Sequence, residues 1–249
     1  MGHIAPIRAE LVNDRVAVTL PCGTAMRLPL VCRRNPRARR AQLRVDSARR
    51  HVALTLPPGF RQAQAEIFLQ RHAGWLASQI AALPAARPFR DGVELAYRGE
   101  PVRIRHDPAL RGTVQLGEGQ VIVGGAAEFV PRRLADWLRA QARAELSRTA
   151  MDLAAGIDRR PRRVAVRELH SRWGSCAPNG NLSFAWRLIL APPEVLTYVA
   201  VHEVAHLRHA NHGPAFWALV REMMPAADAA RRWLREQGPN LFAYGAEAA

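Results

Sequence analysis

The sequence predicts an α+β fold, with a β-rich N-terminal lobe that carries one helix, followed by a lobe with a small antiparallel sheet and further helices. Short segments near the N-terminus alternate apolar and polar residues, as in strands with one buried face. Longer segments repeat apolar residues every three to four positions, as in amphipathic helices. One helical segment near the C-terminus is apolar on most of its surface. We expect the lobes to span residues 1–125 and 126–249.

Strands dominate the start of the chain, and Pro57-Pro58-Gly59 ends their run. The segment from Gln62 to Leu83 then has helical spacing of its apolar residues, which predicts one amphipathic helix. The expected strands are Ile7–Leu11, Val16–Leu20, Met26–Val31, Ala41–Val45 and His51–Leu56. The inner face of the helix is expected to carry Ile67, Phe68, Trp75, Leu76 and Ile80.

After a short linker from Pro84 to Pro88, the chain returns to strands and then to a long helix. Arg98-Gly99-Glu100 separates two short strand patterns, which predicts a hairpin. The expected elements are hairpin strands Glu94–Tyr97 and Val102–His106, strands within Gly112–Val123, a helix from Arg132 to Gly156, and strands Val164–Leu169 and Leu182–Trp186 around the loop Trp173–Asn179.

The composition predicts a globular protein without a membrane anchor. Of the 249 residues, 49% are hydrophobic, yet no apolar run reaches about 18 residues without a charge or a proline. The N-terminal segment contains Arg8 and Glu10 and lacks the apolar core of a signal peptide. Cys22, Cys32 and Cys176 form no Cys-x-x-Cys pair, which argues for a reducing compartment. We expect a cytoplasmic bacterial protein.

The formal net charge of +15 comes from arginine alone, because the chain has no lysine. Arginine clusters create a positive surface that attracts polyanions. No recognised nucleic-acid module accompanies them, and aromatic residues are not interleaved with them. A solvated arginine-rich face is therefore favoured, and nucleic acid is a weakly supported partner. The clusters are Arg33-Arg34, Arg37, Arg39-Arg40, Arg49-Arg50, and Arg159-Arg160 with Arg162-Arg163.

The apolar helix near the C-terminus has clear start and stop signals. Pro192-Pro193-Glu194 favours a helix start, because proline suits the first turn and the acid lies near the positive end of the helix dipole. Asn211-His212-Gly213-Pro214 ends the helix, and Pro214 can begin another. The second helix would carry Phe216, Trp217, Leu219, Val220 and Met223.

Two histidines and a glutamate lie at the end of the apolar helix. His202 and His206 are four residues apart, so both imidazoles project from one face, with Glu203 between them in the sequence. Two neutral imidazoles can hold Zn²⁺ and leave an open position, while a carboxylate that is not a ligand takes a proton from water. Such a buried place is unfavourable for imidazoles unless a metal satisfies them. The pattern predicts a zinc site.

A catalytic zinc site needs a third protein ligand, and three candidates follow. His212 lies in the turn beyond the helix and can swing back to the same ion, so it is favoured. Glu222 is the alternative if the third ligand is a carboxylate on the next helix. Otherwise we expect Glu222 to be an ordinary polar residue of that helix, or to accept a hydrogen bond that orients a ligand imidazole. His209 would crowd the helical pair, so we expect it to be solvated or to lie behind a ligand.

Several short blocks follow in order: Arg172-Trp173-Gly174-Ser175-Cys176, Asn181-Leu182-Ser183, Trp186-Arg187-Leu188, Ala191-Pro192-Pro193-Glu194, His202-Glu203 and Asn211-His212-Gly213-Pro214. Together they resemble the YgjP-like metallopeptidases, bacterial zincins related to the SprT-like and WLM proteases. The resemblance is strongest over residues 160–240 and looser in the N-terminal half. It implies a zincin-like second lobe, zinc on His202, His206 and His212, and Glu203 as the catalytic glutamate.

The resemblance implies a zinc-dependent metallopeptidase that cleaves polypeptides with a zinc-activated water and Glu203 as the general base. A metal-dependent nucleoside-triphosphate pyrophosphatase on the same site is one alternative. The arginine-rich surface suits a phosphate substrate, but no phosphate-cradling glycine loop is present. The other alternative is a non-catalytic, zinc-containing protein associated with nucleic acid. Glu203 argues against it, because a structural site has no use for that carboxylate.

Several neighbours of the motif have two interpretations each. Leu182–Trp186 is either a free sheet edge, on which an extended peptide can lie, or an internal strand. Cys176 is expected to be a small, half-buried thiol and not a switch-like ligand. Trp173 either lines a substrate pocket or anchors its loop to the core. The candidate donors to a developing oxyanion are Arg172, Arg187, His170 and Tyr244, and the sequence does not choose among them.

Overall fold

A computed structural model describes residues 9–12, 15–19, 25–46 and 49–247 of the chain. The chain divides into two compact units between Ala85 and Ala86, and each unit has its own hydrophobic core. This division comes earlier than the expected boundary at residue 125. The reason is that Val121 and Val123 pack into the same core as Leu134, so the sheet before residue 125 belongs to the second unit.

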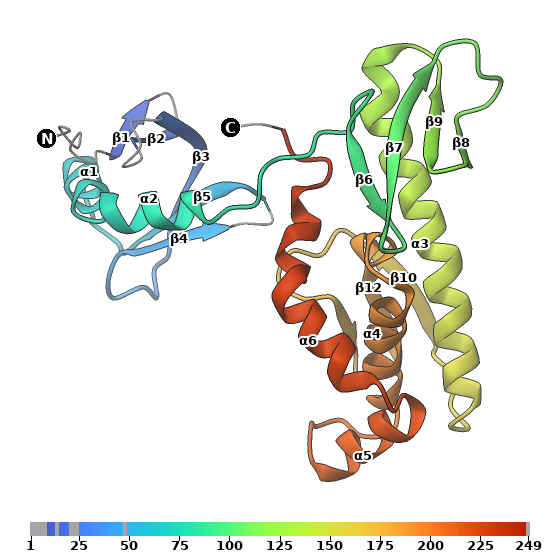
Figure 1. The fold of residues 1–249 in the computed structure, drawn as a ribbon. Helices are drawn as coiled ribbons and strands as arrows, with labels where there is room; N and C mark the ends of the chain where they lie inside the picture. Colours follow the sequence, from blue (N-terminus) through green and yellow to red (C-terminus); the bar gives the residue numbers. More distant parts are fainter. Residues whose placement is uncertain (1–8, 13–14, 20–24, 47–48, 248–249) are drawn as a thin grey trace, which may run out of the picture. The chain divides into compact units, whose positions relative to one another are not determined.

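The first unit is a five-stranded sheet with two helices (Figure 1). β3 and β5 are parallel, and the other neighbouring strands are antiparallel. The start of the expected strand Ile7–Leu11, the end of Val16–Leu20, and Cys22 lie outside the described residues. The order across the sheet is β1 (Ala9–Val12), β2 (Arg15–Thr19), β3 (Ala25–Arg34), β5 (His51–Leu56) and β4 (Gln42–Asp46).

The helix expected from Gln62 to Leu83 is two helices, α1 (Gln62–Arg71) and α2 (Ala73–Ala81). His72 lies at the break, with its Nδ1 atom 2.8 Å from the carbonyl oxygen of Phe68. The ring of His72 also packs on that of Phe68. The same carbonyl oxygen also accepts a hydrogen bond of 3.3 Å from the backbone N–H of His72, so both the ring and the backbone of His72 contact it where the two helices meet.

Two residues expected on the inner face of this segment are exposed instead. Ile67 is 55% exposed and Trp75 is 41% exposed. Helix α1 buries Ala65 and Leu69, and Ile67 lies two positions from each, on the opposite face. Each short helix buries a narrow stripe, so the inner face predicted for one long helix was too wide. The buried stripe of α2 consists of Ala73, Leu76, Ala77 and Ile80.

The second unit contains a four-stranded sheet that begins with the predicted hairpin. Helix α3 (Val130–Ala155) follows, and its 26 residues make contact with both sheets of the unit (Figure 1). The sheet order is β6 (Glu94–Tyr97), β7 (Glu100–Asp107), β9 (Gln120–Gly124) and β8 (Val114–Gly117). The buried positions of α3 recur every four residues and form one stripe: Val130, Leu134, Leu138, Ala142, Leu146, Ala150 and Ala154.

The small sheet of the second unit has the order β10 (Arg163–Arg167), β12 (Asn181–Ala185) and β11 (Gly174–Cys176). β10 and β12 are parallel while β11 and β12 are antiparallel, so the sheet is mixed and not antiparallel as expected. β12 covers most of Leu182–Trp186 and pairs on both sides, so of the two interpretations the internal strand is correct and the candidate free edge is not. One of its faces is buried through Leu182 and Phe184, and Asn181 and Ser183 on the other face are half-buried. The edge strand beside the apolar helix is β11.

Helix α4 (Pro193–Ala205) begins at its prolines, as predicted, and is buried along most of its length. An almost wholly apolar helix can be surrounded by other elements. It packs against α3, α5 (Pro214–Met223) and α6 (Ala227–Gln237). No described helix is both long and apolar enough to cross a membrane. Short 3-10 helices connect these elements: η1 (Ala127–Phe129), η2 (Trp186–Leu190) and η3 (Gly238–Ala243).

We predict that Leu138→Ala lowers the melting temperature of the second unit by roughly 5–15 °C, because truncating a core leucine costs about 2–5 kcal/mol. Leu138 is 0% exposed and belongs to a core that contains residues of both sheets. Differential scanning calorimetry measures the shift. Leu116→Ala is the matched control, because Leu116 on β8 is 43% exposed. Equal melting temperatures for the two variants would contradict the described packing.

Candidate active site

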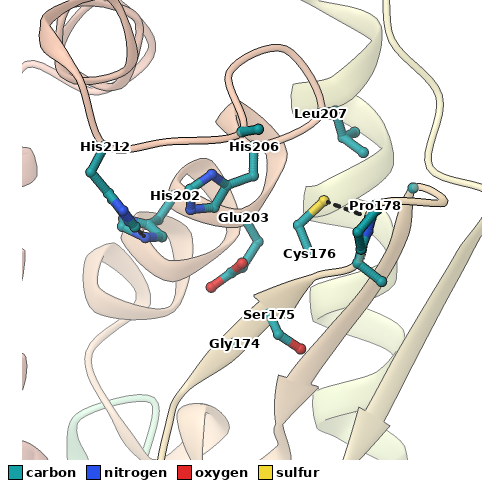
Figure 2. A pocket seen from close by; sticks show the side chains of 12 residues that line it. Gly174, Ser175, Cys176, Pro178, His202, Glu203, His206, Leu207 and His212 are labelled. Carbon is teal, nitrogen blue, oxygen red and sulfur yellow. Dashed lines mark hydrogen bonds between the residues drawn. The ribbon is translucent and has the colours of Figure 1, made fainter.

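The three predicted histidines converge at the end of α4. His202 and His206 lie one helical turn apart, and His212 reaches back from the turn before α5 (Figure 2). One ring nitrogen from each histidine lies within 4.8 Å of the other two. The Nε2 atoms of His202 and His212 are 3.0 Å apart. Two nitrogen ligands of one tetrahedral Zn²⁺ are about 3.3 Å apart, so this separation fits a shared metal ion.

A single aromatic ring lies against all three imidazoles. The ring centroid of Phe216 on α5 is 5.0 Å from that of His202, 4.5 Å from that of His206 and 4.7 Å from that of His212. Phe216 is fully buried two residues after Pro214, which begins α5. The ring therefore supports the spacing of the histidines from behind. The sequence placed Phe216 on an apolar helix face, but it contained no signal for this contact.

The surroundings of His202 and His212 favour their neutral forms. Burial lowers the pKa of His202 to about 4, and the positive charges of His206, His212 and Arg231 act in the same direction. Burial, followed by the charges of His206 and Arg231, also lowers the pKa of His212. Neutral imidazole is the form that coordinates a metal, so these shifts favour binding.

A backbone carbonyl orients His206. Its Nδ1 atom lies 3.0 Å from the carbonyl oxygen of His209. Because Nδ1 must donate in this hydrogen bond, Nε2 keeps its lone pair for a metal. His209 thus acts behind a ligand through its backbone, while its imidazole is not part of the convergent group. Glu222 is exposed on α5 and is also outside that group.

The carboxylate of Glu203 is buried beside the histidines, with the residue only 6% exposed. Burial raises its pKa to about 7, and the charge of Arg172 and a hydrogen bond from the backbone N–H of Cys176 oppose the shift. A carboxyl group with a pKa near neutrality can both accept and release a proton at physiological pH. The site thus brings together three imidazoles that could hold a metal ion and one carboxyl group that can exchange a proton near neutral pH.

Gly174 makes room for this carboxylate. A Cβ atom on Gly174 would lie 2.6 Å from both Cγ and Oε1 of Glu203, closer than atoms can approach. The absence of a side chain therefore lets strand β11 pass directly against Glu203. The sequence did not single out Gly174 for a role, although a glycine within a strand is a known sign of close approach.

The histidines, Glu203 and β11 enclose a pocket of about 580 Å³ (Figure 2). Cys176 lines the pocket as a half-buried thiol, and burial followed by the charge of Glu203 raises its pKa. Trp173 is not among the lining residues and packs against Phe242, so it anchors its loop to the core. The lining consists of residues 174–178, Gly180, His202, Glu203, His206, Leu207, Ala210 and His212.

Two of the four candidate oxyanion donors are engaged elsewhere. Arg187 pairs with Glu168 and stacks on the ring of Trp186 at 4.5 Å. The hydroxyl of the buried Tyr244 accepts a hydrogen bond of 2.9 Å from Arg87. Of the other two, Nδ1 of His170 lies 4.0 Å from the Glu168 carboxylate. Arg172 is exposed, and its charge acts on Glu203.

We predict that Gly174→Ala lowers turnover at least about 100-fold while leaving the metal content unchanged. The new methyl group would displace the Glu203 carboxylate and leave the histidines in place. Ser175→Ala is the matched control, because it changes the next residue of the same strand without a new contact to Glu203. Turnover and zinc content measured on both variants test this role. Full activity of Gly174→Ala would refute the close approach.

Known proteins provide an independent comparison. The chain matches the family described as YgjP-like, metallopeptidase domain, over residues 39–237, which is most of its length. It is also similar to the crystal structure of the metallopeptidase zymogen of Pyrococcus abyssi abylysin, with 22% identity, 39% of this chain and 95% of that chain covered, and a TM-score of 0.33. That likeness is too weak to carry an argument, and no curated protein matches. The family match is extensive, and the chain belongs to the YgjP-like metallopeptidase family.

Proposed function

We propose that this protein is a zinc-dependent peptidase in which His202, His206 and His212 hold the metal and Glu203 moves the proton. The observation that carries the proposal is the convergence of three imidazoles beside a buried carboxylate. Three protein ligands leave an open position on a tetrahedral ion, which is the arrangement of catalytic zinc sites. When bound, Zn²⁺ acidifies water and polarises a substrate carbonyl group.

Glu203 is the residue that would shuttle the proton during peptide hydrolysis. Its carboxylate accepts a proton from the attacking water and then donates it to the leaving amine. Burial raises the pKa of Glu203 to about 7 in the metal-free site, which favours proton uptake, and beside a bound cation the pKa would be lower, which favours proton release. Arg172 is our candidate for stabilising the negative charge that develops on the carbonyl oxygen, because it is an exposed cation two residues before β11, on which the substrate would lie.

Strand β11 is the element on which a peptide substrate would lie. It is an edge strand, it lines the pocket from Gly174 to Cys176, and it passes against Glu203. An extended peptide can add to such an edge through backbone hydrogen bonds. A peptide in that place would bring its own carbonyl groups past the carboxylate and the histidines.

The proposed ligand set predicts about one zinc ion per chain, and His212→Ala should lose most of it. His209→Ala is the matched control, because its imidazole lies outside the convergent group and its backbone carbonyl remains available to His206. Elemental analysis after dialysis measures both. Full zinc occupancy in His212→Ala would contradict the assignment of His212 as a ligand, as would equal losses of zinc in the two variants.

The proposed proton transfer predicts that Glu203→Gln keeps its zinc but loses about 10²–10⁴-fold in turnover, because an amide cannot accept the proton. Wild type and variant are compared on an unfolded protein and on nucleoside triphosphates. Cleavage of the protein that disappears in the variant is the expected result. Hydrolysis of nucleotides alone would support the pyrophosphatase alternative. No difference between wild type and variant on either substrate would support the non-catalytic one.

A further inference from the structure

An arginine cluster lies in the turn between α3 and β10. Arg159, Arg160, Arg162 and Arg163 are all exposed, and none forms an ion pair with a carboxylate in the part of the chain that the structure describes. Asp158, which is also exposed, is the one acidic residue in this segment. The cluster therefore keeps a large uncompensated positive charge.

This cluster adjoins the active-site pocket. The backbone N–H of Arg162 donates a hydrogen bond of 3.0 Å to the carbonyl oxygen of Gly180, and Arg163 is the register partner of Asn181. Gly180 lines the pocket, and a Cβ atom on it would lie 3.9 Å from the Leu207 side chain, which also lines the pocket. Pro178 and Leu207 lie at the end of the pocket away from His212 (Figure 2). The cluster adjoins this end through its hydrogen bond to Gly180.

A fifth arginine is next in sequence to a residue of the same end. Arg208 follows Leu207 directly, is exposed, and has no carboxylate partner among the described ion pairs. We call these five residues the basic rim: Arg159, Arg160, Arg162, Arg163 and Arg208. Arginine presents a forked set of donors that matches a carboxylate, so unpaired arginines beside a pocket are ready to receive one.

The basic rim differs from the ion-paired arginines of α3 in its charge balance. On α3, Arg132 and Arg139 both pair with Asp136, at 3.5 and 3.0 Å, and Arg148 pairs with Glu145 at 3.0 Å. Other exposed arginines of the second unit, such as Arg105 and Arg111, resemble the rim in having no carboxylate partner among the described ion pairs. What sets the rim apart is its place, because its backbone is hydrogen-bonded to Gly180 at one end of the pocket.

We propose that the basic rim selects acidic polypeptide substrates, by binding carboxylate side chains on one flank of the scissile bond. This inference rests on the proposed peptidase function. A peptide added to β11 runs from Gly174 past Cys176 toward the turn at Pro178. Residues a few positions from the scissile bond then reach the rim. Exposed ion pairs are individually weak, so the selection depends on several of them together and weakens with salt.

Binding to the zinc-loaded Glu203→Gln protein tests the rim without turnover. Three labelled peptides share one sequence and carry three consecutive aspartates on the N-terminal flank, three on the C-terminal flank, or asparagines at both places. Fluorescence anisotropy at low salt should show that one acidic peptide binds about tenfold more tightly than the asparagine peptide. At high salt the contrast should shrink.

Charge-reversal variants of the Glu203→Gln protein test which arginines cause the tighter binding of the acidic peptide. Arg162→Glu with Arg163→Glu should reduce the tenfold contrast to about twofold or less. Arg105→Glu with Arg111→Glu is the matched control, because it makes the same change in net charge at exposed residues of β7 and of the loop before β8, whereas Arg162 and Arg163 adjoin Gly180 and Asn181. The control should keep the contrast. Equal binding of all three peptides, or an unchanged contrast in the rim variant, would overturn the inference.

Cleavage assays with wild type separate this inference from the proposed function. If all three peptides are cleaved at equal rates and bind equally tightly, the proposed peptidase function stands and the proposed selection of acidic substrates by the basic rim is refuted. If an acidic peptide binds more tightly than the asparagine peptide, the rim variant loses this difference, and no peptide is cleaved, then the basic rim is an acidic-peptide site and the proposed peptidase function is refuted.

Discussion

The C-terminal end of α4 buries the Glu203 carboxylate and partly buries the His202 imidazole, and the electrostatic properties of the site follow from that burial. A low-dielectric environment disfavours the charged form of each group. The pKa of His202 therefore falls to about 4, and that of Glu203 rises to about 7. Neutral imidazoles bind metal, and a carboxyl group near neutrality transfers protons readily. One physical cause thus prepares the ligands and the proposed base together.

Two close contacts keep this arrangement in place. Phe216 supports the three imidazoles from one side, and the bare backbone of Gly174 approaches Glu203 from the other. Because Gly174 belongs to the edge strand β11, the same contact brings an exposed strand edge to the carboxylate. The proposed base and the proposed substrate platform are therefore parts of one packing arrangement.

The convergence of the three histidines could be predicted from the sequence, because it depends on local structure. His202 and His206 are one helical turn apart, and the Gly213-Pro214 break explains how His212 returns to them. Both rules depend on neighbours within a few positions. The pattern of apolar residues likewise predicted most strands and helices, although the segment expected as one helix divides at His72 in a way that periodicity does not show.

The parts that the sequence left open depend on contacts between distant residues. Whether Leu182–Trp186 is an edge or an internal strand is decided by its pairing with both β10 and β11, and no local pattern encodes that order. The contact of Gly174 with Glu203 joins a strand to a later helix. The boundary between the two units depends on the packing of β9 against α3. Each of these features arises from tertiary structure.

X-ray absorption at the zinc edge tests the metal site most directly, because it reports the atoms bound to the ion. We expect three imidazole nitrogens and one oxygen from water, with no sulfur in the first shell. Cys176 lines the same pocket and is the nearest source of sulfur among its lining residues. A sulfur neighbour, or four protein ligands with no exchangeable water, would contradict an open three-histidine site.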